Sequence, residues 1–120
     1  MKRILIADDK PNGRELVRTI LENDGYEVFE AADGQQAVER ARQLHPDLVI
    51  LDLHMPILDG FGAVEALRKE AEFNRTPVMA LTASAMMGDR ERALGAGFTG
   101  YCTKPIRLSA LRAEVQRPLS

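Results

Sequence analysis

Three acidic residues stand directly after apolar stretches of the chain. Asp8 and Asp9 follow residues 4–7, and Asp52 follows residues 48–51. Carboxylates held close together repel one another, and some take up protons, unless a cation lies between them. Hard divalent cations such as Mg²⁺ bind oxygen ligands of this kind. If these two stretches end side by side, the sequence predicts an acidic site able to hold a metal ion.

A hydroxyl group and an amine follow two further apolar stretches. Thr82 comes after residues 78–81, and Lys104 comes shortly after residues 99–102. A lysine beside several acids lowers the cost of bringing their charges together. Each residue alone is typical of a loop start, a turn or a solvated surface. The complete set is a more specific indication of a functional site than any of its members. The combination predicts one functional site built at the ends of these stretches.

Apolar stretches alternate with helix-like segments along the whole chain. Residues 48–51 and 78–81 are apolar without alternation, which indicates strands buried on both faces, as in a parallel sheet. A barrel of such repeats needs about twice this length. We therefore expect a doubly wound α/β domain with its functional site at the carboxyl ends of the strands. The expected strands are 4–7, 26–30, 48–51, 78–81 and 99–102, and the expected helices are 11–23, 33–45, one from 59 onward, one from about 85 to 95 or 97, and one through 108–115.

Individual residues predict where these helices begin and end. Pro11 suits a first helical turn, and Asp33 and Asp59 suit the N-cap position. Helical spacing places Ala71 on the inner face of the helix that follows Asp59. Residues 117–120 have the composition of a frayed end.

Composition and charge exclude several functional classes. The 120 residues predict a single domain, 1–120, with a net charge of −2 and a hydrophobic fraction of 45%. Scattered basic residues give no case for a nucleic-acid or membrane partner. The single cysteine, Cys102, has no internal disulfide partner and is expected to act as a small hydrophobic residue. Because Met1 leads straight into a strand-like stretch, no signal peptide is predicted, and we expect a cytoplasmic location.

The motifs together resemble a known family. They are similar, in order and spacing, to the receiver domain of two-component response regulators: Asp8-Asp9, Asp52 with Met55-Pro56 and Asp59-Gly60 after it, Thr82-Ala83 and Lys104-Pro105. The resemblance covers essentially the whole chain, and residues 82–106 further resemble single-domain regulators of the DivK type. It implies a flavodoxin-like fold with strand order 2-1-3-4-5 and five helices. It also implies a phosphoacceptor in a two-component or phosphorelay pathway.

The resemblance implies a chemical role for each residue of the site. Asp52 would be the phosphoacceptor, whose carboxylate attacks the phosphorus of a partner's phosphohistidine and forms an acyl phosphate. Mg²⁺ or Mn²⁺ would be held by Asp9, Asp52 and the backbone carbonyl of His54, with Asp8 acting mainly through a bound water. Lys104 would place its ammonium group on the phosphoryl oxygens, in a chain segment with a cis peptide bond before Pro105. Phosphoryl transfer of this kind depends mostly on positioning and charge neutralisation.

The resemblance also implies a switch. Thr82 would donate its hydroxyl to the phosphoryl group, and the small Ala83 leaves room for it. The ring of Tyr101 would rotate inward behind the hydroxyl and change the surface of the fourth helix, fifth strand and fifth helix, where a downstream protein target binds. The side chains of His54 and Ser84, each two residues past a functional position, would tune the lifetime of the phosphate.

A histidine kinase or a histidine phosphotransfer protein is the implied phosphodonor, and it would dock beside the site. The implied contact residues are Asn12, Gly13, Leu16, Pro105 and Ile106. Leu16 lies at the edge of an apolar stripe wide enough for both core and partner contacts, so the sequence leaves its role open. No nucleic acid and no membrane is expected among the partners.

Three other interpretations account for parts of the pattern. The chain could be a receiver excised from a hybrid histidine kinase or a multidomain regulator. Nothing after Val115 suggests an effector, and we therefore expect a free-standing protein. A phosphatase of the haloacid dehalogenase type uses a similar aspartate, but it places a second acid where this chain has His54. A nucleotide- or flavin-binding module needs a loop of amide donors, whereas the loop at residues 8–11 is acidic. We expect a phosphoacceptor that catalyses only its own phosphorylation and dephosphorylation.

Overall fold

Five parallel strands form one sheet in the order β2-β1-β3-β4-β5 in the computed structural model, which describes residues 1–83 and 88–119. The predicted doubly wound α/β fold and its strand order are confirmed. The strands are β1 (Arg3–Ala7), β2 (Glu27–Ala31), β3 (Leu48–Asp52), β4 (Val78–Thr82) and β5 (Gly100–Thr103). The helices in the described part of the chain are α1 (Pro11–Asn23), α2 (Gly34–Leu44), α3 (Gly60–Arg68), the short 3₁₀ helix η1 (Ala71–Phe73), α4 (Asp89–Ala96) and α5 (Leu108–Leu119).

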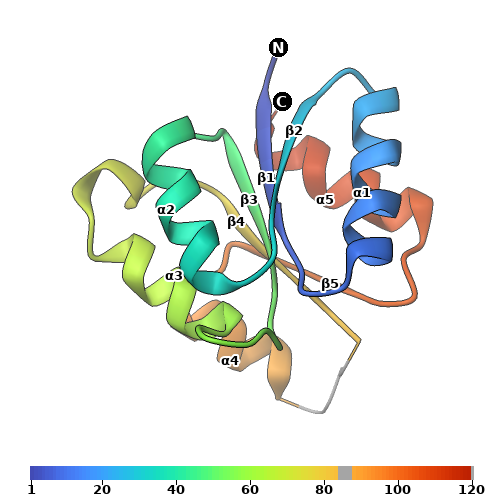
Figure 1. The fold of residues 1–120 in the computed structure, drawn as a ribbon. Helices are drawn as coiled ribbons and strands as arrows, with labels where there is room; N and C mark the ends of the chain where they lie inside the picture. The colour runs from blue at the N-terminus through green and yellow to red at the C-terminus, as the bar shows by residue number, and fades with distance from the viewer. Residues whose placement is uncertain (84–87, 120) are drawn as a thin grey trace.

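Helices cover both faces of the sheet. Figure 1 shows α1 and α5 on one face, and α2, α3 and α4 on the other. Each face has its own hydrophobic core, one containing Val17 of α1 and Val115 of α5, the other containing Val38 of α2 and Val64 of α3. Because helices cover both faces, a site is expected at the ends of the strands, where the loops leave the sheet.

The central strand β3 carries Asp52 as its last residue. It pairs with β1 on one side and with β4 on the other, and all five of its residues are buried. Ile50 contacts the core under α1 and α5, while Leu51 contacts the opposite core. The absence of alternation in this stretch therefore reflects burial on two faces, and the strand is a rigid mount for Asp52.

Three predicted helix starts are confirmed by the structure. Pro11 is the first residue of α1, where its missing N–H costs no helical hydrogen bond. The Asp33 carboxylate caps α2 by accepting a hydrogen bond from the Gln36 N–H at 2.8 Å. The Asp59 carboxylate caps α3 in the same way, accepting from the Gly62 N–H at 2.8 Å.

Several predicted boundaries are wrong by a residue or more. The helix after Asp59 ends at Arg68, so Ala71 lies in η1 and is exposed rather than on an inner face. The Arg68 guanidinium donates to the carbonyls of Phe73 and Thr76 at 2.6 and 2.7 Å, which holds the chain in a turn where helical spacing alone predicts continuation.

The C-terminal end also differs from its prediction. The last helix does not fray at residue 117 but runs through Pro118 to Leu119, which packs against the core under α1 and α5. Strand β2 begins at Glu27 and β5 at Gly100, each one residue later than expected. The described part of α4 begins at Asp89, and its predicted start near residue 85 lies outside the described residues.

Cys102 is buried in β5, as expected of a small hydrophobic residue. Among residues 1–83 and 88–119, none of the helices has the length and apolar character needed to cross a bilayer.

Candidate functional site

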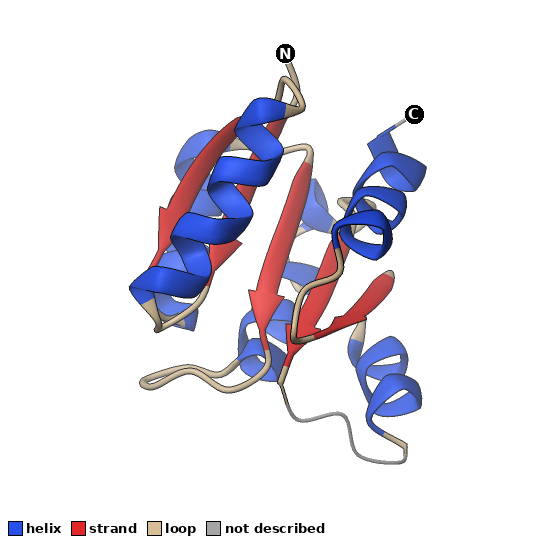
Figure 2. Cartoon of the chain, turned by 90° about the vertical axis from the view of Figure 1, so that its right-hand side faces the viewer, coloured by secondary structure: helices blue, strands red, loops and turns tan. Residues whose placement is uncertain are grey.

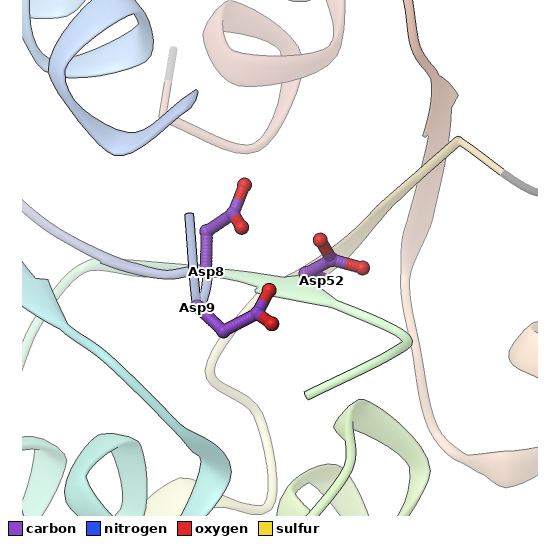
Figure 3. A group of neighbouring side chains, drawn as sticks. All are labelled: Asp8, Asp9 and Asp52. Atoms are coloured by element: carbon purple, nitrogen blue, oxygen red, sulfur yellow. The ribbon is translucent and has the colours of Figure 1, made fainter. Parts of the chain in front are cut away.

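The three predicted acids meet at one edge of the sheet. Figure 2 shows the strands pointing the same way, so that the loops after β1 and β3, which are neighbours, leave at adjoining points. Asp8, Asp9 and Asp52 offer carboxylate oxygens that lie within 4.8 Å of one another (Figure 3). Asp8 and Asp52 are 1% and 7% exposed, whereas Asp9 is exposed to solvent. Two of the three charges are therefore buried and need compensation.

Lys104 supplies that compensation. Its Nζ donates to Asp8 Oδ2 at 2.7 Å and to Asp52 Oδ2 at 3.0 Å. Burial lowers the pKa of Lys104, but the hydrogen bonds and charges of the two carboxylates outweigh it and leave the pKa raised. The Lys104 backbone N–H donates to the Thr82 carbonyl at 2.8 Å, so the pairing of β4 with β5 places the lysine. The Lys104–Pro105 peptide bond is cis, as the resemblance implies.

Backbone amides orient two of the three acids. The His54 N–H donates to Asp52 Oδ1 at 3.0 Å, and the Lys10 N–H donates to Asp8 Oδ1 at 2.9 Å. The Asp9 carboxylate accepts no hydrogen bond from the residues that the structure describes, so its oxygens are free for a ligand. An all-oxygen set with one unengaged carboxylate fits a hard divalent cation, and the residues present are therefore suited to Mg²⁺ or Mn²⁺.

A hollow of about 440 Å³ opens beside Asp9 and Asp52. Its lining consists of Asp9, Lys10, Asp52, His54, Ala83 and Lys104. Thr82 ends β4 directly before Ala83 and is fully buried, and it is not one of the residues that line this hollow. A buried carboxylate, an ammonium and a small side chain around one open volume leave space for a tetrahedral anion next to Asp52.

Of the other residues with predicted roles, Tyr101 is described by the structure and Ser84 is not. Tyr101 is 9% exposed and packs in the core beneath α2, α3 and α4. Burial raises the pKa of its hydroxyl, and the charge of Asp89 raises it further. Ser84 lies outside the described residues. The switch roles of Thr82 and Tyr101 stay predictions, as do the tuning roles of His54 and Ser84.

The predicted docking residues do come together. Asn12, Gly13, Leu16, Pro105 and Ile106 line one hollow of about 560 Å³ that also reaches Asp9 and Lys104. Leu16 is 51% exposed, so the structure decides against a core role for it. Gly13 has a further function that its sequence context does not reveal, because an added Cβ would lie 2.8 Å from Asp8 Oδ2. Only glycine leaves the Asp8 carboxylate in its present position.

Two residues near the site were not singled out from the sequence. Arg14 donates from Nη1 to the Asp8 carbonyl at 2.6 Å, a contact to the backbone that no charge pattern signals. Ile57 has a φ of 70° and is 81% exposed, while the Leu58 N–H donates to the Pro56 carbonyl at 2.7 Å around it. That three-residue turn is strained for a β-branched side chain. This backbone conformation is seen only in the structure, because an isoleucine in the sequence gives no indication of a positive φ.

Comparison with known proteins places the whole arrangement in one family. A family model described as the response regulator receiver domain matches residues 4–116. The chain is 36% identical over 105 residues to the polar-differentiation response regulator DivK of Brucella ovis, covering 88% of this chain and 85% of that protein. It is 39% identical over 118 residues to the probable transcriptional regulator ycf27 of Porphyridium aerugineum, covering 98% of this chain but 48% of that protein, so it spans about half the length of such relatives.

A solved structure shows the same fold with a metal in place. The receiver domain of the sensor histidine kinase PA1611 from Pseudomonas aeruginosa PAO1, solved with a magnesium ion coordinated in its active site cleft, has a TM-score of 0.91 and 37% identity. The match covers 99% of this chain and 98% of that one. The sheet order, the acid cluster and the family match agree, and the chain therefore belongs to the response regulator receiver domain family.

Proposed function

We propose that this chain is a phosphoacceptor of a two-component or phosphorelay pathway and that Asp52 receives the phosphoryl group. The observation that carries the proposal is the position of Asp52, buried at the end of β3, held by Lys104 and open to a hollow beside two further acids. An Asp52 oxygen attacks the phosphorus of a phosphohistidine, and an acyl phosphate forms as the phosphorus–nitrogen bond breaks. The electron pair of that bond and a proton go to the departing imidazole. Each chain takes up one phosphate and releases it by hydrolysis, without turnover of a separate substrate.

The acid cluster would hold a divalent cation during this transfer. Asp9, Asp52 and the backbone carbonyl of His54 are the proposed ligands of Mg²⁺ or Mn²⁺, with Asp8 acting through water. The cation, when bound, neutralises charge on the oxygens of the transferring group. Asp9 supports this assignment because its exposed carboxylate has no hydrogen bond from the described residues.

Lys104 and Thr82 hold the transferred group in this proposal. The Lys104 ammonium already lies 3.0 Å from Asp52 Oδ2, so it is positioned to meet a phosphoryl oxygen on that carboxylate. Thr82 ends the neighbouring strand and donates its hydroxyl, while Ala83 keeps the hollow open. Movement of that hydroxyl is coupled to Tyr101, and the change is read at the surface of α4, β5 and α5. The His54 side chain, which lines the hollow, tunes the lifetime of the phosphate together with Ser84.

A protein carrying phosphohistidine, either a histidine kinase or a phosphotransfer protein, is the proposed donor. It would dock in the hollow formed by Asn12, Gly13, Leu16, Pro105 and Ile106, which is continuous with Asp9 and Lys104. The half-exposed Leu16 supports this assignment, because it presents apolar surface to solvent within this hollow. The same chemistry suits a receiver that forms part of a kinase, as in PA1611.

Phosphate incorporation tests the proposal. Incubation with acetyl phosphate and Mg²⁺ should add a single phosphate, detected by intact-protein mass spectrometry, and Asp52→Asn should abolish it. Asp59→Asn is the matched control, because asparagine retains the N-cap of α3. Equal labelling of Asp52→Asn and the parent protein would overturn the assignment. Repeated turnover of a phosphomonoester would instead support an aspartate-nucleophile phosphatase.

A further inference from the structure

Arg14 joins the acidic site to the edge strand of the sheet. Its side chain is 17% exposed and lies between α1, the end of β1 and strand β2. Nη1 donates to the backbone carbonyl of Asp8 at 2.6 Å, and Nε donates to Glu30 Oε1 at 3.0 Å. One planar guanidinium therefore holds a backbone group of the acidic loop and a carboxylate of β2 at the same time.

Glu30 is itself held in place. Arg18, one turn along α1 from Arg14, donates from Nη1 to Glu30 Oε2 at 2.7 Å. The hydrogen bond from Arg18 lowers the pKa of Glu30 and that from Arg14 lowers it further, together outweighing the effect of burial. Glu30 stays ionised at neutral pH and fixes the direction of the Arg14 side chain. Among the described residues, Arg18 donates no hydrogen bond to the acidic loop, and its other ion-pair partner is Glu22 at 3.2 Å.

Without Arg14, the carbonyl would be the one polar group of Asp8 that has no hydrogen-bond partner among the described residues. The Asp8 N–H donates to the Ala31 carbonyl at 3.1 Å, and the two Asp8 carboxylate oxygens accept from Lys10 and Lys104. The carbonyl of Asp8 and the N–H of Asp9 share one rigid peptide plane. The bond from Arg14 therefore sets the direction in which Asp9 leaves the strand. Because the Asp9 carboxylate has no hydrogen bond of its own from the described residues, this backbone direction is the restraint that these contacts place on its oxygens.

We propose that Arg14 is a positioning residue of the cation site: through the Asp8 carbonyl it orients Asp9 toward Asp52, and Glu30 is its anchor. The inference rests on the proposed function, because it concerns the cation that the acid cluster would hold. Removal of a group that orients a metal ligand commonly lowers metal affinity, on the order of 10- to 100-fold.

Charge and position give opposite expectations for Arg14. A positive charge near three acids repels an incoming cation, so loss of the charge alone would tighten cation binding. Loss of the positioning bond would weaken it. The direction of the change therefore separates the two roles.

Magnesium affinity of the complete chain, measured by isothermal titration at fixed ionic strength, tests the inference. Arg14→Met keeps the length of the side chain but removes charge and donors, and binding should weaken about 10-fold. Arg14→Lys keeps the charge without the planar fork, so it cannot serve both acceptors, and binding should weaken about threefold. Arg18→Met is the matched control: it also leaves Glu30 with one arginine fewer, but it should alter affinity less than twofold.

Urea unfolding of each variant establishes that the proteins compared are folded. If Arg14→Met does not fold, the affinity of Arg14→Lys tests the inference. Binding by Arg14→Lys as tight as in the parent, or tighter binding by Arg14→Met, overturns the positioning role. If the parent protein itself binds no Mg²⁺, the proposed cation site fails instead. The two failures are thus distinguishable from one set of titrations.

Discussion

The pairing of Lys104 with two buried acids predicts a large and magnesium-sensitive loss of stability in Lys104→Met. The ammonium lies 2.7 and 3.0 Å from the carboxylate oxygens of Asp8 and Asp52, and its side chain is 17% exposed. Methionine preserves much of the aliphatic stem but leaves both acids without a counter-charge. Those acids also repel one another, because their oxygens lie in a cluster spanning no more than 4.8 Å.

The expected loss follows from this burial. Removing one partner of a buried ion pair costs about 3 to 5 kcal/mol, and the partial exposure of Lys104 places the cost near the lower end, about 3 kcal/mol. A domain of this size has a free energy of unfolding of roughly 6 to 18 kcal/mol, so the variant should remain folded. Magnesium should then stabilise the variant more than the parent, because the ammonium no longer competes for the carboxylates. Ligand at 100 times its dissociation constant adds about 2.7 kcal/mol to stability.

Urea unfolding at neutral pH, with EDTA and with a saturating concentration of MgCl₂, measures both effects. Lys2→Met removes an exposed lysine away from the acids and is the control for loss of a positive charge. The reasoning is refuted if Lys104→Met loses no more stability in EDTA than Lys2→Met does. It is also refuted if magnesium leaves the gap between Lys104→Met and the parent unchanged.

The structure makes four further predictions. Stability from Lys104 is complete below its ordinary pKa of 10.5 and is lost as the pH rises through its raised folded value, which chemical unfolding at successive alkaline pH values should show by comparison with Lys104→Met. Arg68→Gln should lower the free energy of unfolding by about 3 kcal/mol, since the arginine donates four hydrogen bonds to backbone carbonyls, and a urea midpoint close to that of the parent would contradict this. Asp33→Ala should cost about 1 kcal/mol by removing the cap of α2, seen as a lower melting temperature, whereas Asp33→Asn should not. Ile57→Gly should raise the free energy of unfolding by about 0.5 to 1 kcal/mol, because glycine accepts a positive φ without strain, and an unchanged or lower urea midpoint would argue against that strain.

Features that depend on neighbouring residues were predictable from the sequence. The N-caps at Asp33 and Asp59 each require one carboxylate and an amide three residues on, so the signal is local. The unbroken apolar stretch before Asp52 indicates a strand buried on both faces, and the parallel order of the sheet then brings the acids after β1 and β3 together. The core of the site follows from these two steps.

Contacts between long side chains and distant backbone groups were not predictable. Arg14 and Arg68 both donate to carbonyls, which every residue possesses, so no residue type marks the acceptor. The apolar spacing through Ala71 fits a helix that continues past Arg68. The contacts of the Arg68 side chain with the backbone instead hold this part of the chain in a turn. The closeness of Gly13 to Asp8 depends on the angle at which α1 leaves its loop, which no short-range pattern encodes.

The burial of β3 has a consequence for hydrogen exchange. Its amides lie between β1 and β4 and under helices on both faces, so they should exchange only when the entire domain opens. Asp52 ends a fully buried central strand rather than lying on a loop that opens separately. Heat should therefore not disturb the proposed phosphoacceptor site before it unfolds the protein: loss of phosphate incorporation and global unfolding should coincide, and the slowest amides of β3 should report the stability of the backbone that carries Asp52.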